Sequence, residues 1–216
     1  MQLTVIQEIV IWALPVLFAI TLHEVAHGWV AKQLGDPTAQ MLGRITLNPI
    51  KHIDPVGTVL VPLLLLVLPG NFLFGWAKPV PITPQNLRNP RRDMAIVALA
   101  GPTANFIMAL LWAIIARAAV WLDEPFLTNP LVLMGFAGIA INLVLMILNL
   151  IPLPPLDGGR IVSNLLPPRT SAKYDLVEPY GFMILVLLLM TGILGGLLSP
   201  FFNFFQSLLL SLVGLR

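Results

Sequence analysis

Two histidines and a glutamate lie close together near the start of the chain, in the sequence His23-Glu24-Val25-Ala26-His27. Residues four apart lie on one face of a helix, so both imidazoles can bind a single metal ion. Glu24 projects from the flank of that face, where its carboxylate can accept a proton from a metal-bound water. The pattern therefore predicts a metal site with a general base beside it.

A catalytic zinc site needs a third protein ligand and one open position. Gln33 stands where an extended metzincin pattern has its third histidine, and no glutamate lies between Glu24 and Glu124. The third ligand must therefore come from elsewhere in the chain. The candidates are four aspartates: Asp36, Asp54 (close to His52), Asp93 and Asp157.

The composition is that of a membrane protein. Apolar residues make up 57% of the chain and charged residues 10%, whereas soluble domains have about 45–50% and about 25%. The absence of cysteine excludes disulfides, thiolate metal sites and thiol catalysis. A net charge of +2 is too small to indicate nucleic-acid binding.

The apolar runs predict an all-α polytopic membrane protein with about five to six transmembrane helices, since about 20 residues cross the hydrocarbon core. Long runs cover about residues 9–31, 94–122, 130–151 and 180–198, and shorter runs cover 56–68 and 201–215. The alternation in Gly43–Asn48 and the β-branched and aromatic stretch Asn71–Ile82 predict short β-hairpin elements. We expect one domain, 1–216, with a catalytic core at about 9–165 and C-terminal helices at about 176–216.

Asp157 is set apart from the other aspartates by its surroundings. Three prolines and two glycines, in the stretch from Asn149 to Arg160, end an apolar run in irregular backbone. Such backbone is tolerated at membrane depth only when it is buried in protein or lines a wet cavity. Asp157 is therefore the favoured third ligand, and the alternative is an N-cap of the helix after Gly159. For His52 and Asp54, the dipeptide Asp54-Pro55 favours a helix start at the interface.

The paired motifs resemble those of the site-2 proteases, a family of intramembrane zinc metalloproteases. The resemblance rests on His23-Glu24-xx-His27 in an early helix and on Asn149-xx-Pro152-x-Pro154-x-Leu156-Asp157-Gly158 at the end of a later one. Gly101-Pro102-xx-Asn105 and the stretch from Gly43 to Gly57 are similar to the family pattern as well. The resemblance covers about residues 15–165, with no room for a PDZ or cystathionine-synthase-type domain, as in a minimal member.

The resemblance implies that His23, His27 and Asp157 bind Zn²⁺ and that Glu24 is the catalytic base. It also implies peptide-bond hydrolysis in or near transmembrane segments, with transmembrane proteins as substrates and membrane lipid around the chain. Asn105 or Asn149 could donate a hydrogen bond to the oxyanion. The alternative for each asparagine is helix–helix hydrogen bonding.

If the two motifs form one site, the helices that carry them must run in the same direction. They do so if the run Val56–Leu68 is re-entrant, and its length of about 20 Å is too short to cross the hydrocarbon core. Glu8, Asp123 and Glu124, with Arg117 near them, are then on one side of the membrane. The other side carries Lys32, Arg44, Lys51, Lys78, Arg88, Arg91, Arg92, Arg160, Arg169, Lys173 and Arg216.

By the positive-inside rule the basic side is cytoplasmic. We therefore expect an integral protein of a bacterial or archaeal cytoplasmic membrane, with its active site toward the cytoplasmic face. Two other classes were weighed. A membrane metal-ion transporter should carry acidic or histidine residues along several spans, and a non-catalytic scaffold should have lost Glu24 or a ligand.

Overall fold

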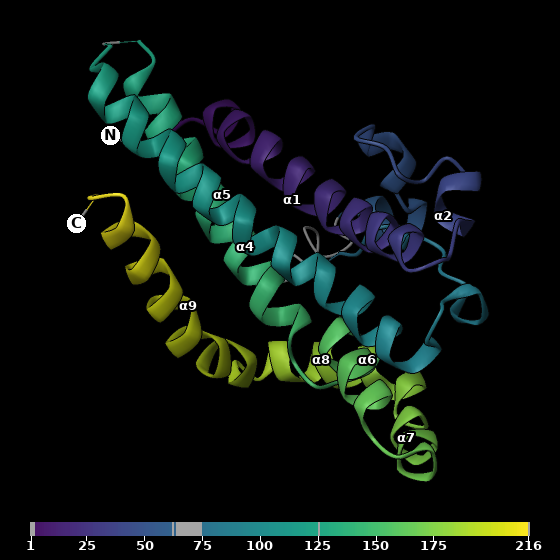
Figure 1. The fold of residues 1–216 in the computed structure, drawn as a ribbon. Helices are drawn as coiled ribbons and strands as arrows, with labels where there is room; N and C mark the ends of the chain where they lie inside the picture. Colours follow the sequence, from purple (N-terminus) through teal and green to yellow (C-terminus); the bar gives the residue numbers. More distant parts are fainter. Residues whose placement is uncertain (1–2, 62, 64–74, 125, 216) are drawn as a thin grey trace.

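The computed structural model describes residues 3–61, 63, 75–124 and 126–215, and its framework is helical (Figure 1). The long helices are α1 (Val5–Gln33), α4 (Pro90–Leu122), α5 (Thr128–Asn149) and α9 (Ile193–Leu212). Each of these four is long and apolar enough to span a membrane. The chain is therefore an all-α membrane protein, with four candidate spans in the part that the structure describes.

The remaining helices are shorter and lie between or after the spans. Four follow α1 and precede α4: α2 (Thr38–Met41), η1 (Pro49–His52), η2 (Pro55–Leu60) and η3 (Pro84–Asn86). Three follow α5: α6 (Asp157–Leu165), α7 (Pro168–Asp175) and α8 (Glu178–Met190). Of these, α8 is apolar but shorter than a span.

The helices α1, α4 and α5 pack against one another and form the core (Figure 1). Small residues such as Ala109 and Ala113 let α4 approach α5 closely, as is common where helices meet in a membrane. Leu209 brings α9 to the same core. The largest buried cluster is Ala109, Trp112, Ala113, Ile139, Leu143, Met146, Ile147 and Leu209.

Helices α1 and α5 run in the same direction, and α4 runs opposite to both (Figure 1). The end of α1 and the start of α4 meet directly, because the Arg88 N–H donates to the Leu34 carbonyl at 3.1 Å. The connection between them therefore returns to the end of the bundle that it left, as the shared-site argument requires. The re-entrant run predicted at Val56–Leu68 itself lies mostly outside the described residues.

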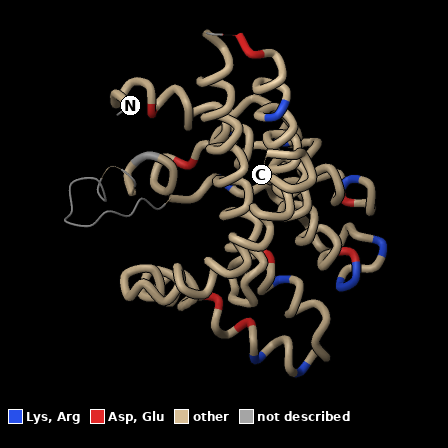
Figure 2. The backbone as a smooth tube through the Cα atoms, turned by 90° about the vertical axis from the view of Figure 1, so that its left-hand side faces the viewer, with Lys and Arg blue, Asp and Glu red and all other residues tan. Residues whose placement is uncertain are grey.

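Basic residues are concentrated at the end of the bundle where α1 ends and α4 begins (Figure 2). Lys32 lies in the last turn of α1, and Arg91 lies in the first turn of α4. The prediction for Arg216 falls on a residue that the structure does not describe. However, a Cβ added at Gly214 would lie about 4 Å from the Arg117 guanidinium, so the end of α9 lies at the opposite end of the bundle, which has few basic residues.

The short strands expected at Gly43–Asn48 and Asn71–Ile82 are not found in the described part of these stretches. Gly43–Asn48 forms turns and bends, in which the Arg44 N–H donates to the Ala39 carbonyl. Asn48 then caps η1 by accepting from the Ile50 N–H. Alternation indicates a strand only where a partner strand supplies hydrogen bonds, and the prolines near residue 80 leave few donors for such a ladder.

The C-terminal helices also differ from the expected runs 180–198 and 201–215. The break falls at Gly192, whose φ of +74° ends α8 in the left-handed conformation that glycine adopts readily. Pro200, which lies between the two expected runs, is inside α9. The Ser199 hydroxyl donates to the Gly196 carbonyl at 3.3 Å, so the partner lost to the proline is replaced. The spanning helix is therefore α9.

Candidate metal centre

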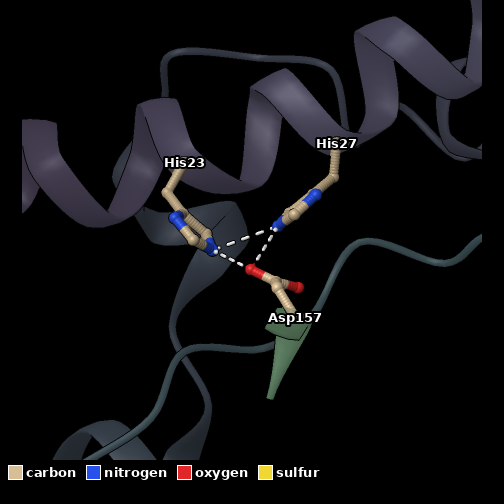
Figure 3. A group of neighbouring side chains, drawn as sticks. All are labelled: His23, His27 and Asp157. Atoms are coloured by element: carbon tan, nitrogen blue, oxygen red, sulfur yellow. Dashed lines mark hydrogen bonds and ion pairs between the residues drawn. The ribbon is translucent and has the colours of Figure 1, made fainter. Parts of the chain in front are cut away.

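His23, His27 and Asp157 converge inside the bundle (Figure 3). The two histidines come from successive turns of α1, and Asp157 is the first residue of α6. The two Nε2 atoms are 3.0 Å apart, and Asp157 Oδ2 lies 3.2 Å from that of His23 and 3.3 Å from that of His27. All three residues are buried. The structure thus brings together the three residues that the sequence analysis assigned to one metal ion.

The other nitrogen of each imidazole bonds to an oxygen. His23 Nδ1 lies 2.6 Å from Asn105 Oδ1, and His27 Nδ1 lies 2.7 Å from the Val97 carbonyl. Because a carbonyl oxygen can only accept, each Nδ1 must carry the hydrogen and donate. In the neutral imidazole the Nε2 lone pair is then free for a metal ion. This is the tautomer that outer-shell hydrogen bonds select in metal sites.

Three buried lone pairs therefore face one another without a donor among them. Asp157 Oδ2 has no hydrogen-bond partner of its own in the described structure, so with neutral imidazoles a bound cation would offset the repulsion between these atoms. Ligands at about 2.0 Å from a tetrahedral zinc ion are about 3.3 Å apart. The spacings of 3.0–3.3 Å between these atoms fit that value.

Asp157 is not the N-cap that the sequence analysis offered as its alternative role. Leu156 caps α6, and no side chain makes a capping hydrogen bond there. The carboxylate instead points away from the helix end toward the two histidines (Figure 3). The glycines that follow are needed for close packing. A Cβ would lie 2.3 Å from the Leu150 carbonyl oxygen at Gly158, and 2.4 Å from the Pro154 nitrogen at Gly159.

The other three candidate aspartates accept hydrogen bonds from backbone N–H groups instead of facing the histidines. Asp54 accepts from the N–H groups of the first turn of η2, which confirms the helix start predicted at Asp54-Pro55. Asp93 accepts from the Asn89 N–H just before α4. Although burial raises the pKa of Asp36, hydrogen bonds from Thr38, Thr83 and Asn86 bring it below its ordinary value.

Glu24 lies beside the metal-binding face of α1 and is half-buried. Its Oε2 atom accepts a hydrogen bond from the Val80 N–H at 2.7 Å. Val80 belongs to the extended stretch that precedes η3, and this stretch is held by Arg44, whose guanidinium donates to the Lys78 carbonyl at 2.8 Å. His52 is buried in the same region, and its carbonyl accepts from the Lys78 N–H. Glu24 is thereby fixed by a segment far away in the sequence.

The two asparagines proposed as oxyanion donors lie in different settings. Asn105 is fully buried, and its amide group donates to the Ala19 carbonyl and to Asn142 Oδ1 while its oxygen faces His23. Both amide hydrogens are therefore used, which favours the helix–helix alternative. Asn149 is half-buried at the end of α5 and donates to the Leu145 carbonyl, which leaves its second amide hydrogen available. Its role toward a substrate stays a prediction.

Gly101 of α4 leaves the space that the imidazoles occupy. A Cβ at this position would lie 2.4 Å from His27 Nε2 and 2.5 Å from His23 Cε1. We expect Gly101→Ala to weaken zinc binding by at least about 10-fold, because the added methyl group would push the imidazoles out of place. Disturbing the groups that support a metal ligand has an effect of this size. Metal analysis of the purified variant checks this. Gly195→Ala is the control, because nothing lies within 4 Å of its Cβ position. Unchanged zinc binding in Gly101→Ala would show that the imidazoles can move aside.

Two positioning features have no clear signal in the sequence. The donor to Glu24 is a backbone N–H, which any residue except proline can supply. Asn142, which contacts Asn105, lies within the apolar run that became α5. The sequence gives one indication for Asn142: an amide side chain lies within an apolar run, and polar residues in membrane spans usually have a specific role.

The fold and this site define a class: a membrane protein with spanning helices around a buried His-His-Asp group. The comparisons are consistent with it. The family model for peptidase family M50 matches residues 122–192, a stretch that contains Asp157. The Bacillus subtilis protein named "Putative zinc metalloprotease YwhC" is 38% identical over 199 residues, covering 87% of this chain and 83% of the relative. The chain belongs to peptidase family M50, the site-2 proteases.

More distant relatives carry the same description under the name Rip2. Rip2 of Mycolicibacterium smegmatis is 32% identical over 179 residues, which is 81% of this chain and 64% of the relative. Rip2 of Mycobacterium tuberculosis H37Rv is 29% identical over 184 residues, which is 83% of this chain and 66% of the relative. No solved structure shows a significant match to the chain.

Proposed function

We propose that this chain is an intramembrane zinc metalloprotease that hydrolyses peptide bonds in or near the transmembrane segments of other proteins. The observation that carries the proposal is the convergence of His23 Nε2, His27 Nε2 and Asp157 Oδ2, with Glu24 next to them. The names of the relatives, which describe zinc metalloproteases, support zinc as the metal. The four candidate spans support a substrate that reaches the site from within the membrane.

His23, His27 and Asp157 would hold the zinc ion, which would act as a Lewis acid that activates water near neutral pH and polarises a peptide carbonyl. Glu24 is the general base. It accepts a proton as the water oxygen bonds to the carbonyl carbon, and it delivers that proton to the amine nitrogen as the C–N bond breaks. The Val80 N–H holds one oxygen of the Glu24 carboxylate, so its orientation is set before substrate binds.

The site is proposed to open toward the cytoplasm. Asp157 lies where α5 has ended, at the end of the bundle that carries most of the basic residues (Figure 2). Lys and Arg are enriched on the cytoplasmic side of membrane proteins. We propose that the chain lies in the cytoplasmic membrane of a bacterium or archaeon, with water reaching the site from the cytoplasmic face.

Chelation tests the proposed activity directly. We expect the purified protein to cleave at least one member of a panel of single-span membrane proteins in detergent. Activity should disappear with 1,10-phenanthroline, return with added zinc and withstand a serine-directed inhibitor. Cleavage is followed by gel electrophoresis and mass spectrometry. Cleavage that continues after metal analysis has shown complete zinc removal would contradict the proposal. Zinc uptake into proteoliposomes without any cleavage would favour a transporter instead.

Single cysteines test the orientation, because the chain has none of its own. Cysteines at Gln33, the last residue of α1, and at Gln85, within η3, should resist a membrane-impermeant maleimide added to intact cells. A cysteine at Asn129 should react, because it lies at the other end of the bundle. One at Leu215 should react as well, since the C-terminal end lies near Arg117. Labelling in the reverse pattern would place the site on the outer face.

A further inference from the structure

Asn142 is a fully buried amide within the spanning helix α5. Its Nδ2 donates to the Gly138 carbonyl at 2.8 Å, and its Oδ1 accepts from Asn105 Nδ2 at 2.9 Å. Neither bond reaches the metal-binding atoms. Burying an amide in a membrane span is costly unless its partners are satisfied, and such residues usually have a functional role. The question is what this one does.

The bonds of Asn142, together with the bond from Asn105 to the Ala19 carbonyl, fix which way round the amide of Asn105 lies. The Gly138 carbonyl can only accept, so the NH₂ group of Asn142 must face it and the oxygen of Asn142 must face Asn105. The NH₂ group of Asn105 must then face Asn142, with its second hydrogen on the Ala19 carbonyl at 3.2 Å. The oxygen of Asn105 is consequently left to face His23 Nδ1, at 2.6 Å.

We propose that Asn142 is a positioning residue for the metal centre. A chain of hydrogen bonds, the row that runs from the Gly138 carbonyl through Asn142 to Asn105, places the Asn105 oxygen as an acceptor beside His23 Nδ1. It thereby keeps the hydrogen of His23 on Nδ1 and the lone pair of Nε2 directed at the metal. The inference rests on the proposed function in one respect, namely that His23 Nε2 binds zinc. It adds that the zinc affinity of an α1 ligand is set by a residue of α5.

Two substitutions separate this role from packing. Asn142→Leu removes both bonds of Asn142, so only the longer bond to the Ala19 carbonyl, at 3.2 Å, still holds the Asn105 amide in the described structure, and the amide can rotate more readily to present a donor to His23. We expect it to weaken zinc binding about 10–100-fold, the usual effect of losing an outer-shell partner. Asn142→Asp should bind zinc nearly as well as the wild type. In its neutral form the carboxylic acid offers the same carbonyl acceptor to Asn105 and an O–H donor to Gly138.

If Asn142 has a purely structural role, the order of zinc affinities is reversed, and Asn142→Leu should bind zinc better than Asn142→Asp. Leucine has the same branching and number of non-hydrogen side-chain atoms as asparagine and suits an apolar bundle, whereas an acidic side chain in a span is unfavourable. Asn164→Leu is the matched control. Asn164 makes the same kind of bond, to the Arg160 carbonyl four residues earlier at 2.8 Å, and takes no part in the row that leads to His23.

The first measurement is the zinc dissociation constant of the purified full-length chain in detergent, by competition with a chromophoric chelator. The second is nitrogen NMR of histidine-labelled, metal-free protein, which reports the tautomer of His23 and is tractable because the chain has three histidines. The wild type and Asn142→Asp should show the hydrogen on Nδ1 of His23. Asn142→Leu should show a mixture with the Nε2 form.

Equal zinc affinity and an unchanged His23 tautomer in Asn142→Leu would overturn the proposal, and so would weaker binding in Asn142→Asp than in Asn142→Leu. Should the leucine variant fail to fold, Asn142→Ala replaces it, since a small residue is tolerated between packed helices. The tautomer is measured without metal. A chain that binds no zinc would therefore refute the proposed function, while the NMR spectra would still test the role of Asn142.

Discussion

Glu24→Gln should abolish proteolysis while the purified protein keeps its full complement of zinc. Glutamine has nearly the shape of glutamate, and its oxygen can still accept from the Val80 N–H. It cannot take a proton from water, and loss of a general base costs about 10²–10⁴-fold in rate. The measurement combines substrate cleavage with metal analysis on the same preparation.

Glu8→Gln is the control for this substitution, because Glu8 is an exposed glutamate in the first turn of the same helix. It should leave both activity and zinc content unchanged. Normal cleavage by Glu24→Gln would remove Glu24 from the role of base. Loss of zinc from Glu24→Gln would instead make Glu24 part of the metal site.

Replacing any of His23, His27 and Asp157 by alanine should remove both zinc and activity. Each residue contributes one of the three converging atoms. The loss of affinity should exceed the about 10–100-fold that is typical of outer-shell partners. Metal analysis after gel filtration checks zinc content, and the elution volume checks that the variants remain folded.

Asp54→Ala and Asp93→Ala are the matched controls, because both aspartates were candidate ligands by sequence and both bond to backbone N–H groups in the structure. They should keep zinc. Full zinc in Asp157→Ala together with depletion in Asp54→Ala would assign the third position to Asp54.

The part of the site that depends on local geometry could be predicted from the sequence. The spacing of His23 and His27 places them on one helix face whatever else the chain does. Asp157 is distant in sequence, but the prolines and glycines around it indicated irregular backbone at the end of a span, and this backbone does bring it to the histidines. The parallel course of α1 and α5 followed from requiring one shared site.

Features that depend on partners from elsewhere could not be predicted. The alternation of Gly43–Asn48 predicted a strand, but the stretch forms turns and bends, and no strand pairs with it among the residues that the structure describes. The apolar runs 180–198 and 201–215 predicted a break near residue 200, but the break is at Gly192, and α9 continues through Pro200 because the Ser199 hydroxyl restores the lost hydrogen bond. The hydrogen bond from the Val80 N–H to Glu24 could not be predicted, because any residue except proline can supply a backbone N–H.

X-ray absorption at the zinc edge of the purified, active protein tests the central claim most directly. We expect zinc bound by two imidazole nitrogens and a carboxylate oxygen at about 2.0–2.2 Å, with a further light-atom ligand in the open position. In Asp157→Ala reloaded at high zinc concentration, the carboxylate contribution should be absent. Active protein that contains no zinc, or zinc without imidazole ligands, would contradict the assignment of His23, His27 and Asp157 as the metal centre.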